Sequence, residues 1–321
     1  MKKKYAVSII IPLYNEELNI EPLINRLNVV ILDFRQKYNE DVEVVFVNDG
    51  SVDGTLDLVV NSNIKSFDSK VLNLSRNFGH QPAVLAGLTE VKDSLSAMVI
   101  DGDLQDPPEL LLDMYSMLIK GNDVVYAVRQ KRKENKVLVF FYNLFYRVLN
   151  HLTNGLIPKD SGDFALMSTR VVDKIVDFPE SQKFIRGLRA WVGFKQVPFF
   201  YERDARRFGS SKYSISMLFK LAKNGIFNFT DKPLSLINRI GLMSMMLGII
   251  YFMVILAKKI IGIKVVDGFT SMVALFVFFT GVQLFSLGII AEYIGRIFKE
   301  VKGRPTYIVE KVFELERAEK L

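Results

Sequence analysis

Two aspartates stand two residues apart directly after an apolar run of strand length. The run ends at Ile100, Asp101 and Asp103 follow it, and Gln105 comes next but one. In an extended or gently turning backbone, both carboxylates can reach one cation that prefers oxygen ligands, such as Mg²⁺ or Mn²⁺. Such a cation bridges the phosphates of a nucleoside diphosphate and stabilises the charge that develops on it as a leaving group. The pair predicts a divalent-metal site, with Gln105 as a neutral oxygen ligand or a hydrogen-bond partner.

Two further polar clusters follow apolar runs nearer the amino terminus. Pro12, Tyr14 and Glu16 close the first run, where Tyr14 could stack on a base and Glu16 could accept a hydrogen bond from it. Asp49 follows the second run and could accept from a base or ribose, beside Gly50, which permits close backbone approach. Each cluster taken alone could equally be a turn or a helix start. The sequence has no Gly-x-Gly-x-x-Gly motif and no Walker lysine, so it lacks the phosphate cradle of dinucleotide oxidoreductases and P-loop ATPases.

Composition excludes several other kinds of site. The chain has no cysteine, and its only histidines are His80 and His151, which argues against disulfides, thiolate sites and a histidine-based zinc centre. The net charge is +7, from 42 basic and 35 acidic residues. Because no long Lys/Arg stripe interleaves with aromatic residues, we expect anionic lipid or an anionic substrate rather than nucleic acid.

Strand-length apolar runs alternate with helix-length segments in the first part of the chain. This alternation predicts an α/β fold with a mainly parallel sheet covered on both faces. Ligands of such sheets bind at the carboxyl ends of the strands, where the three polar clusters stand. The expected strands are Val7–Ile11, Val42–Val47, Lys70–Leu74, Ala97–Ile100 and Asp123–Val128, and the expected helices are Glu17–Tyr38, Gly54–Asn61, Gln81–Val91 and Pro108–Ile119.

Two long uncharged apolar segments follow, Ile240–Ala257 and Phe269–Ala291. At ~1.5 Å rise per residue, either could cross a ~30 Å hydrocarbon layer with some extension or tilt. A pair of buried core helices is the alternative. Two crossings return the chain to its starting side, and a modest excess of basic residues on the flanks predicts that the large domain and both termini lie in the cytoplasm, at the plasma membrane.

These segments divide the chain into three parts. We expect a catalytic domain with interfacial helices over 1–229, a two-helix transmembrane anchor over 230–300 and a cytosolic tail over 301–321. The candidates for interfacial helices are Lys136–Leu152 and Tyr213–Phe229, which mix aromatic and aliphatic residues with few charges. A core helix face is an equally good interpretation of both.

Taken together, the polar clusters resemble glycosyltransferase family 2, with its GT-A nucleotide-sugar fold. The match is closer to the polyprenyl-phosphate sugar transferases, which look like dolichyl-phosphate mannose synthase but carry carboxyl-terminal spans. The resemblance covers nearly the whole chain, and the combination is specific although each motif alone is not. It is carried by IIIPLYNEE (9–17), FVNDGSVDGT (46–55), LSRNFGHQPAVLAG (74–87), IDGDLQDPPEL (100–110), SGDFALMS (161–168) and RDARRFGSSKYS (203–214).

The resemblance implies a role for each matching residue. On the donor side, the residues that hold the nucleoside are Pro12, Tyr14, Glu16 and Asp49. The donor site is lined by Arg76 and Gln81. The metal and diphosphate are arranged by Asp101, Asp103 and Gln105. On the acceptor side, Asp163 stands where the family places a carboxylate that is sometimes described as the base, and the segment associated with lipid phosphate holds Arg203, Arg206, Ser211 and Lys212. A lipid monophosphate is already largely anionic near neutral pH, so we expect Asp163 to orient the acceptor rather than remove a proton.

The reaction implied is the transfer of one sugar from a UDP-sugar to polyprenyl (undecaprenyl) phosphate, with inversion and with Mg²⁺ or Mn²⁺ as cofactor. Glucose and N-acetylglucosamine are the leading sugars, by resemblance only. The implied partners are membrane lipid, a flippase for the lipid-linked sugar and a downstream glycosyltransferase, and a homo-oligomer is left open. One alternative is a processive polysaccharide synthase, whose Gln-x-x-Arg-Trp signature is missing from the nearest stretch, Gly187–Trp191. The other is a non-catalytic scaffold that binds a nucleotide-sugar.

Overall fold

The computed structural model describes residues 4–62, 64, 66–129, 161–180, 183–202, 232–261 and 268–317. The chain forms two compact units. The first, here called the sheet unit, comprises Met1–Leu218 and Pro305–Leu321, and the second, the hairpin unit, comprises Phe219–Arg304. The carboxyl-terminal residues therefore return to the unit in which the chain began.

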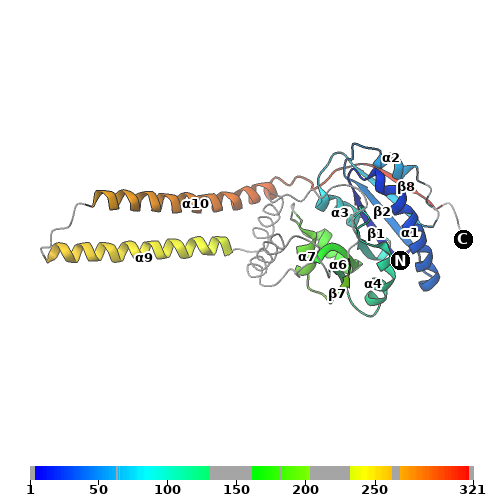
Figure 1. Cartoon of the computed structure of the whole chain (residues 1–321), viewed down its shortest axis with the longest axis horizontal. Coiled ribbons are helices and arrows are strands. Elements are labelled where there is room, and N and C mark those ends of the chain that lie inside the picture. Colours follow the sequence, from blue (N-terminus) through cyan, green and yellow to red (C-terminus); the bar gives the residue numbers. More distant parts are fainter. Residues whose placement is uncertain are drawn as a thin grey trace. The chain divides into compact units, whose positions relative to one another are not determined.

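An eight-stranded mixed sheet forms the centre of the sheet unit, in the order β7-β5-β6-β4-β1-β2-β3-β8. Figure 1 labels β1, β2, β7 and β8 among the helices of this unit. Strands β1 (Tyr5–Leu13), β2 (Val42–Asn48), β3 (Asp68–Leu74) and β4 (Ser94–Val99) run parallel. Strand β6 (Ser161–Ser168) is antiparallel to both β4 and β5 (Val124–Arg129), and β7 (Gln196–Tyr201) is parallel to β5. Strand β8 (Val309–Leu315) is antiparallel to β3.

The described helices of this unit are α1 (Glu17–Tyr38), α2 (Thr55–Val60), α3 (His80–Thr89), α4 (Leu111–Leu118), α6 (Thr169–Asp177) and α7 (Ile185–Trp191), with a 3₁₀ turn η1 (Pro108–Leu110) before α4. The five strands and four helices expected from the sequence are confirmed, with ends displaced by a few residues. The α/β class is confirmed as well. The sheet is mainly parallel as expected, since six of its eight strands run in one direction, and the antiparallel strands β6 and β8 make it a mixed sheet.

Helices cover both faces of the central strands. Every residue of β1 and β2 is buried, as expected for parallel strands with both faces covered. On one face Ile9 and Ile11 share a core with Leu27 and Phe34 of α1. On the other face α3 lies so close that a Cβ added at Gly87 would come within 2.2 Å of Ile10 Cγ2. The sheet is thus held between α1 and α3, and both helices begin just beyond strands at the same edge.

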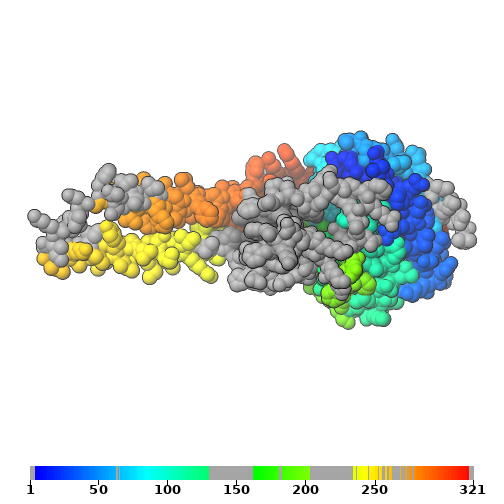
Figure 2. Space-filling view, in the orientation of Figure 1, coloured from blue at the N-terminus to red at the C-terminus, as the bar shows by residue number. Residues whose placement is uncertain are grey.

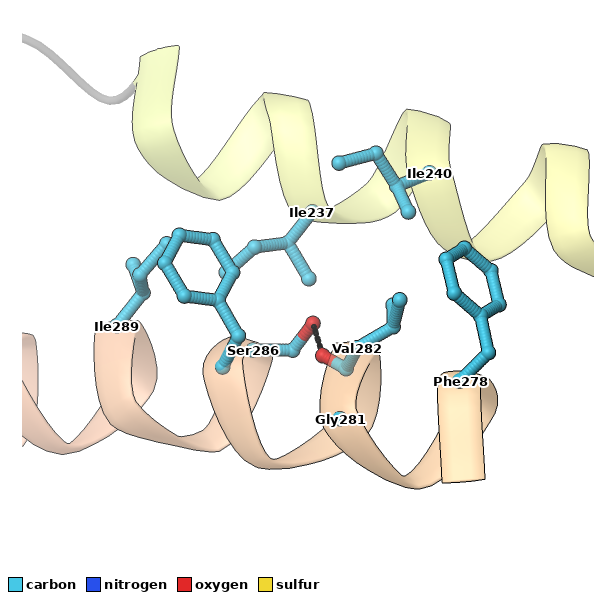
Figure 3. A pocket seen from close by; sticks show the side chains of 8 residues that line it. Ile237, Ile240, Phe278, Gly281, Val282, Ser286 and Ile289 are labelled. Atoms are coloured by element: carbon cyan, nitrogen blue, oxygen red, sulfur yellow. Dashed lines mark hydrogen bonds between the residues drawn. The ribbon is translucent and has the colours of Figure 1, made fainter. Parts of the chain in front are cut away.

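The hairpin unit contains two long helices, α9 (Lys232–Ile260) and α10 (Phe269–Val301), coloured yellow and orange in Figure 2. Both helices expose many apolar side chains. Ile237 and Ile240 of α9 face Phe278 and Val282 of α10 across an apolar pocket (Figure 3). The hydroxyl of Ser286 in that pocket donates to the Val282 carbonyl, 2.8 Å away. Its polar group is therefore satisfied within its own helix.

Among the described residues, one helical segment is long and apolar enough to cross a membrane, Phe278–Val301, with 24 residues and a mean hydropathy of 1.4. The apolar segment of α9, Ile237–Tyr251, is shorter. This segment overlaps the expected span Phe269–Ala291 from Phe278 onward but ends ten residues later, and the two-span anchor stays a prediction.

Candidate active site

The carboxyl ends of β1, β2, β3 and β4 meet at one edge of the sheet because these strands are parallel. Strand β6 begins at the same edge because it runs the other way. Val99 of β4 lies opposite Ala165 of β6. Asp101 follows Val99 by two residues and Asp163 precedes Ala165 by two, so the antiparallel register brings these two aspartates to the same place. The sheet topology therefore assembles carboxylates that are far apart in the sequence.

The loops after β1 and β2 interlock through hydrogen bonds. The backbone N–H of Asn15 donates to Ser51 Oγ at 3.0 Å, and the N–H of Val52 donates back to Asn15 Oδ1 at 2.9 Å. The N–H of Glu16 donates to Thr55 Oγ1 at 2.8 Å. Tyr14, on the first loop, is 42% exposed, which leaves its ring accessible for stacking. These two loops, residues 14–17 and 49–55, hold residues predicted to bind the donor and are called the donor loops below.

Two other predicted nucleoside ligands are engaged within the protein. Pro12 is buried in β1, so it can shape the floor of the site but has no polar side-chain atom to offer. The carboxylate of Glu16 accepts a hydrogen bond from Asn19 Nδ2 at 2.5 Å, in the first turn of α1. Glu16 thus helps to fix the start of that helix.

Asp49 holds the loop that leads into α3. Its Oδ1 accepts the N–H of Phe78 at 2.7 Å and its Oδ2 accepts the N–H of Gly79 at 2.9 Å. Burial raises the pKa of Asp49, against the opposing effect of the two amides. Asp49, which we expected to contact a nucleoside, therefore fixes the backbone of residues 78–79.

Gly50 brings the same two loops into direct contact. Its φ is +65°, and a Cβ there would lie 2.5 Å from both Arg76 C and Asn77 N. No other residue type fits this backbone without displacing the neighbouring chain. Arg76 stacks on the Phe78 ring, with 4.0 Å from Cζ to the ring centroid, and its Nη1 donates to the Asn77 carbonyl. Arg76 therefore lies on the surface beside the donor loops.

The loop after β4 is compact and strained. Asp103 is 7% exposed, and its Oδ1 accepts the backbone N–H of Gln105 at 3.1 Å. Leu104 is buried with φ +61°, a conformation that costs a branched residue free energy and is found at functional sites. Arg26 of α1 pairs with Glu109 through two hydrogen bonds and also donates to the Leu104 carbonyl. Hydrogen bonds from Arg26 of α1 therefore stabilise the backbone that presents the aspartates.

Asp163 is the centre of a charged cluster. Its Oδ2 accepts from Gln81 Nε2 at 2.9 Å and lies 3.4 Å from both His80 Nε2 and Arg186 Nη2. His80 Nε2 is also 3.8 Å from Asp101 Oδ1, so this histidine links the two carboxylates. Gln81 Oε1 accepts the N–H of Ile185 at 2.9 Å. Gln81, expected to line the donor site, thus uses both ends of its amide to join α3, β6 and α7.

The charges of this cluster shift the pKa values of Asp163 and His80 in opposite directions. Burial alone would raise the pKa of Asp163, but the Arg186 guanidinium, His80 and Arg189 hold it well below its usual range. Burial lowers the pKa of His80, yet the hydrogen bond to Asp163 and the charges of Asp101 and Asp163 raise it to about 9. At neutral pH, Asp163 is therefore an anion with little affinity for a proton, and His80 is a cation.

The sequence analysis missed three groups of this site. His80 directly precedes Gln81 in a motif that carries the resemblance, but no local pattern showed its partners. Arg186 and Arg189 flank the Gly187–Leu188 turn of α7, and Arg189, 2% exposed, donates to the Gly162 carbonyl at 3.2 Å. A run with two arginines on a short helix was the available signal.

A buried network supports the site from below. Asp106, 2% exposed, accepts a hydrogen bond from Tyr201 Oη at 2.7 Å. Arg129 Nε lies 3.4 Å from the same Tyr201 oxygen. The aromatic ring of Tyr201 packs edge-on against Phe164. The network ties β5, β6 and β7 to the loop that carries Asp101 and Asp103.

The acidic donor set fits a hard divalent cation. Burial and the negative charges of Asp106, Asp103 and Asp163 raise the pKa of Asp101 to about 6, although His80 lowers it. Mutually repelling carboxylates of this kind are relieved by an oxygen-ligated cation. In the part of the chain that the structure describes, no three His, Cys, Asp or Glu side chains are grouped to hold an ion by themselves. The diphosphate of a substrate would have to supply further ligands.

The predicted lipid-phosphate residues Arg203, Arg206, Ser211 and Lys212 lie outside the described residues. The two candidate interfacial stretches, Lys136–Leu152 and Tyr213–Phe229, lie outside them as well. These assignments stay predictions.

Comparison with known proteins gives a consistent result. The profile of Glycosyl transferase family 2 matches residues 8–176, and that of the GtrB C-terminal hairpin matches residues 232–297. The uncharacterized glycosyltransferase YkcC of Bacillus subtilis (strain 168) is 40% identical over 320 residues, which is 98% of this chain and 97% of that protein. A prophage bactoprenol glucosyl transferase homolog of Escherichia coli (strain K12) is 34% identical over 308 residues, 95% of this chain and 99% of that protein.

One of the matching solved structures shares less of its sequence with this chain. The glucosyl-3-phosphoglycerate synthase from Mycobacterium tuberculosis, in complex with Mn²⁺, uridine-diphosphate and phosphoglyceric acid, is 17% identical and covers 70% of this chain and 76% of its own, with a TM-score of 0.49.

Proposed function

The chain belongs to glycosyl transferase family 2, and from that premise we propose that it transfers a single sugar from a UDP-sugar to polyprenyl phosphate. Relatives that are named bactoprenol glucosyl transferases support a polyprenyl acceptor and favour glucose as the sugar. The hairpin matched over residues 232–297 supports a membrane-bound acceptor. A GT-A fold is the fold expected of the sheet unit in this family.

The observation that carries the proposal is the meeting of two kinds of charge at one sheet edge. Asp101 and Asp103 form an acidic side that suits a cation and a diphosphate. Asp163 lies with His80 and Arg186 on the other side, where cationic groups can compensate an incoming phosphate. A reaction between two phosphate-bearing substrates needs this compensation, because their anionic groups repel each other.

We propose a single in-line displacement. An oxygen of the lipid phosphate attacks the anomeric carbon on the face opposite the departing UDP, the new C–O bond forms as the bond to the diphosphate oxygen breaks, and UDP leaves with the electron pair. The configuration at the anomeric carbon inverts. The phosphate is already anionic, so no proton has to be removed from it.

Asp163 is suited to orienting groups in this step rather than to acting as a base. Arg186, His80 and Arg189 outweigh burial and hold its pKa well below its usual range, and a carboxylate with so low a pKa is a weak proton acceptor. Its Oδ2 instead fixes His80, Gln81 and Arg186 relative to each other. These groups can then meet the acceptor in one arrangement.

A divalent cation, Mg²⁺ or Mn²⁺, would be held by Asp101 and Asp103, with Gln105 near them, and would neutralise charge that develops on the leaving diphosphate. Pro12, Tyr14, Glu16, Asp49 and Arg76 remain the proposed surroundings of the nucleoside. Arg203, Arg206, Ser211 and Lys212 remain the proposed ligands of the lipid phosphate.

The hairpin unit is proposed to cross the plasma membrane twice, with the sheet unit and both termini in the cytoplasm. The domain division 1–229, 230–300 and 301–321 is part of this proposal, although β8 belongs to the sheet rather than to a free tail. A sugar linked to the lipid on the cytoplasmic side needs a flippase and then a downstream glycosyltransferase to reach a cell-envelope glycan.

The proposal is tested by supplying membranes that contain the full chain with undecaprenyl phosphate and a panel of UDP-sugars. We expect mass spectrometry to find one lipid product with a single added hexose, from UDP-glucose. A polymer would favour a processive synthase instead. Nucleotide-sugar binding without any transfer, on every acceptor offered, would favour a non-catalytic scaffold.

A further inference from the structure

The carboxyl-terminal strand β8 contains an irregularity beside the donor loops. Asn73 of β3 pairs with Lys311, but the next residue, Leu74, pairs with Val309, so that Glu310 has no partner of its own in the ladder. A β-bulge of this kind redirects a side chain and is frequent at sheet edges next to active sites. Here it accompanies a hydrogen bond from Asn73 Nδ2 to Glu310 Oε2, at 2.9 Å.

That hydrogen bond is the first of a relay that runs along the sheet edge. Asn73 Oδ1 accepts from Asn48 Nδ2 at 2.7 Å, and Asn48 Oδ1 accepts the backbone N–H of Ser51 at 3.3 Å. Ser51 Oγ in turn accepts the N–H of Asn15. Four successive contacts therefore connect Glu310 on the last strand with both donor loops.

The relay lies where it can affect a ligand site rather than only the sheet. Asn48 is the last residue of β2 and is 2% exposed, so its amide must find its partners within the protein. Those partners are Asn73 on one side and the first turn of a donor loop on the other. If Asn73 moves, the amide of Asn48 loses a partner and the N–H of Ser51 is no longer held in place.

Strand β8 is held independently of this relay. The N–H of Ser75 donates to the Ile308 carbonyl at 3.0 Å at one end of the strand. Beyond the other end, Arg317 Nη1 binds Asp41 Oδ1 at 3.0 Å. Six residues of β3 pair with β8 in the ladder, from Ser69 to Leu74. The strand therefore has enough contacts to remain docked without the Glu310 side chain.

We propose that Glu310 and Asn73 are positioning residues for donor binding: through Asn48 they hold the donor loops in the geometry that accepts the nucleoside of the UDP-sugar. The carboxyl-terminal strand is then part of the donor site's support rather than a passive tail. The inference rests on the proposed function only in taking the donor to be a uridine nucleotide.

The test exchanges the hydrogen-bond donor and the hydrogen-bond acceptor between positions 73 and 310 of the relay. Asn73→Asp puts a carboxylate against Glu310, which breaks this contact by repulsion. In Asn73→Asp/Glu310→Gln, the new amide at 310 donates to the new carboxylate at 73, which still accepts from Asn48. We expect the Kd for UDP, measured by calorimetry on the full detergent-solubilised chain, to rise about five- to tenfold in Asn73→Asp. We expect the double variant to return to within about twofold of the wild type.

Two controls separate positioning from general destabilisation. Glu314→Gln changes an exposed carboxylate on the same strand outside the relay, and we expect an unchanged Kd for UDP. In the transfer assay the KM for the UDP-sugar should rise in Asn73→Asp while the KM for the lipid phosphate stays near the wild-type value. A lower Tm in Asn73→Asp with no change in the Kd for UDP, or a double variant that does not recover binding, overturns the inference.

Failure of the proposed function has a different signature. If the acceptor is not a polyprenyl phosphate, the wild-type chain makes no lipid product, yet the effects of these variants on UDP binding remain as expected. If the wild type itself does not bind UDP, the proposed donor is wrong and the inference is overturned with it.

Discussion

The two aspartates at this edge of the sheet, Asp163 and Asp101, have pKa values that are shifted in opposite directions. The pKa of Asp163 is kept well below its usual range because its cationic neighbours outweigh its burial. Burial and neighbouring carboxylates raise that of Asp101 to about 6. A fixed anion can orient cationic partners, whereas an under-compensated acidic cluster favours an incoming cation. The two aspartates can therefore serve different substrates although they lie at the same edge.

Asp103→Asn tests the acidic side of the site. The asparagine oxygen can still accept the N–H of Gln105, so the turn is preserved while one negative charge is lost. We expect kcat to fall by about 100-fold, the order seen when one stabilising group for developing charge is removed, and Tm to stay close to that of the wild type. The rate of lipid-linked sugar formation gives kcat, and a thermal melt gives Tm. Asp113→Asn, an exposed aspartate of α4, is the matched control and should keep full activity; equal rates in the two variants would rule out the assignment.

At the scale of elements, polar side chains fix how the outer strands join the sheet. Asp123 precedes β5, is 5% exposed, and accepts hydrogen bonds from Ser168 Oγ at 3.2 Å and from the N–H of Lys195 at 3.3 Å. It also pairs with Arg170 of α6. One carboxylate thus joins the segments before β5 and β7, the end of β6 and the start of α6.

Acid should remove the contribution of Asp123 to stability. The Arg170 hydrogen bond and the N–H of Lys195 lower the pKa of Asp123 in the folded chain despite some desolvation. A carboxyl group with a lowered folded pKa stabilises the fold above its unfolded pKa of about 3.9, and that stability is lost as the pH falls through the folded value. We expect Asp123→Asn to lower the free energy of unfolding by about 1 kcal/mol at pH 7, and the difference from wild type to shrink below about pH 4. Denaturant unfolding of both proteins across this pH range tests the prediction. A difference in the free energy of unfolding that does not change with pH would contradict the role of Asp123.

Close packing of α3 on the sheet leads to a second prediction about elements. A Cβ at Gly87 would come within 2.2 Å of Ile10 Cγ2 and 3.2 Å of Val47 Cγ2. Alanine favours helix over glycine by about 1 kcal/mol, but overpacking in a dense core costs about 1–3 kcal/mol, and a contact of 2.2 Å should make the second effect win. Gly87→Ala should therefore lower Tm and weaken UDP binding, because Asp49 of a donor loop binds the backbone of residues 78–79 directly in front of α3. Gly288→Ala on α10 is the control and should leave both unchanged, because among the described residues no atom outside the adjoining backbone of its own helix lies within 4 Å of the added Cβ.

For the whole molecule, the chain leaves the sheet unit, forms the hairpin unit and returns to the sheet unit as β8. This path requires both connections between the units to lie on one side of any membrane that the hairpin crosses. It agrees with two crossings, since an odd number would place β8 on the wrong side from β3. The pairing of β3 with β8 therefore requires an even number of crossings, a condition that the proposed two-span anchor meets.

Cysteine labelling checks this topology directly, because the chain has no cysteine of its own. Gly268→Cys lies in front of α10, between the two long helices, and Asn61→Cys lies in the sheet unit on an exposed residue. In right-side-out vesicles we expect a membrane-impermeant maleimide to label position 268 from outside, and to label position 61 only after permeabilisation. Labelling of position 61 in intact vesicles would reverse the proposed orientation, and exclusion of the reagent from both positions would contradict a complete crossing.

The local properties of the chain were sufficient to predict the first strands and helices and the three polar clusters at the strand ends. Hydrophobic periodicity and turn residues act over a few neighbouring residues, so α1 was predicted with both of its ends correct. The aspartates of 101–103 stand out for the same reason, since a buried strand that ends in carboxylates is visible without any partner. The two-helix segment was also apparent from composition alone.

Only the tertiary structure decided which distant residues meet. Asp163 reaches Asp101 because β6 is antiparallel to β4, and Glu310 reaches Asn73, 237 residues away in sequence, because β8 closes the edge of the sheet. The partners of His80, Gln81 and Asp49 depend likewise on the register of strands and on the packing of α3. Register and packing are set by the free energy of the whole core, in which one residue contributes little, and no short stretch of sequence contains that information.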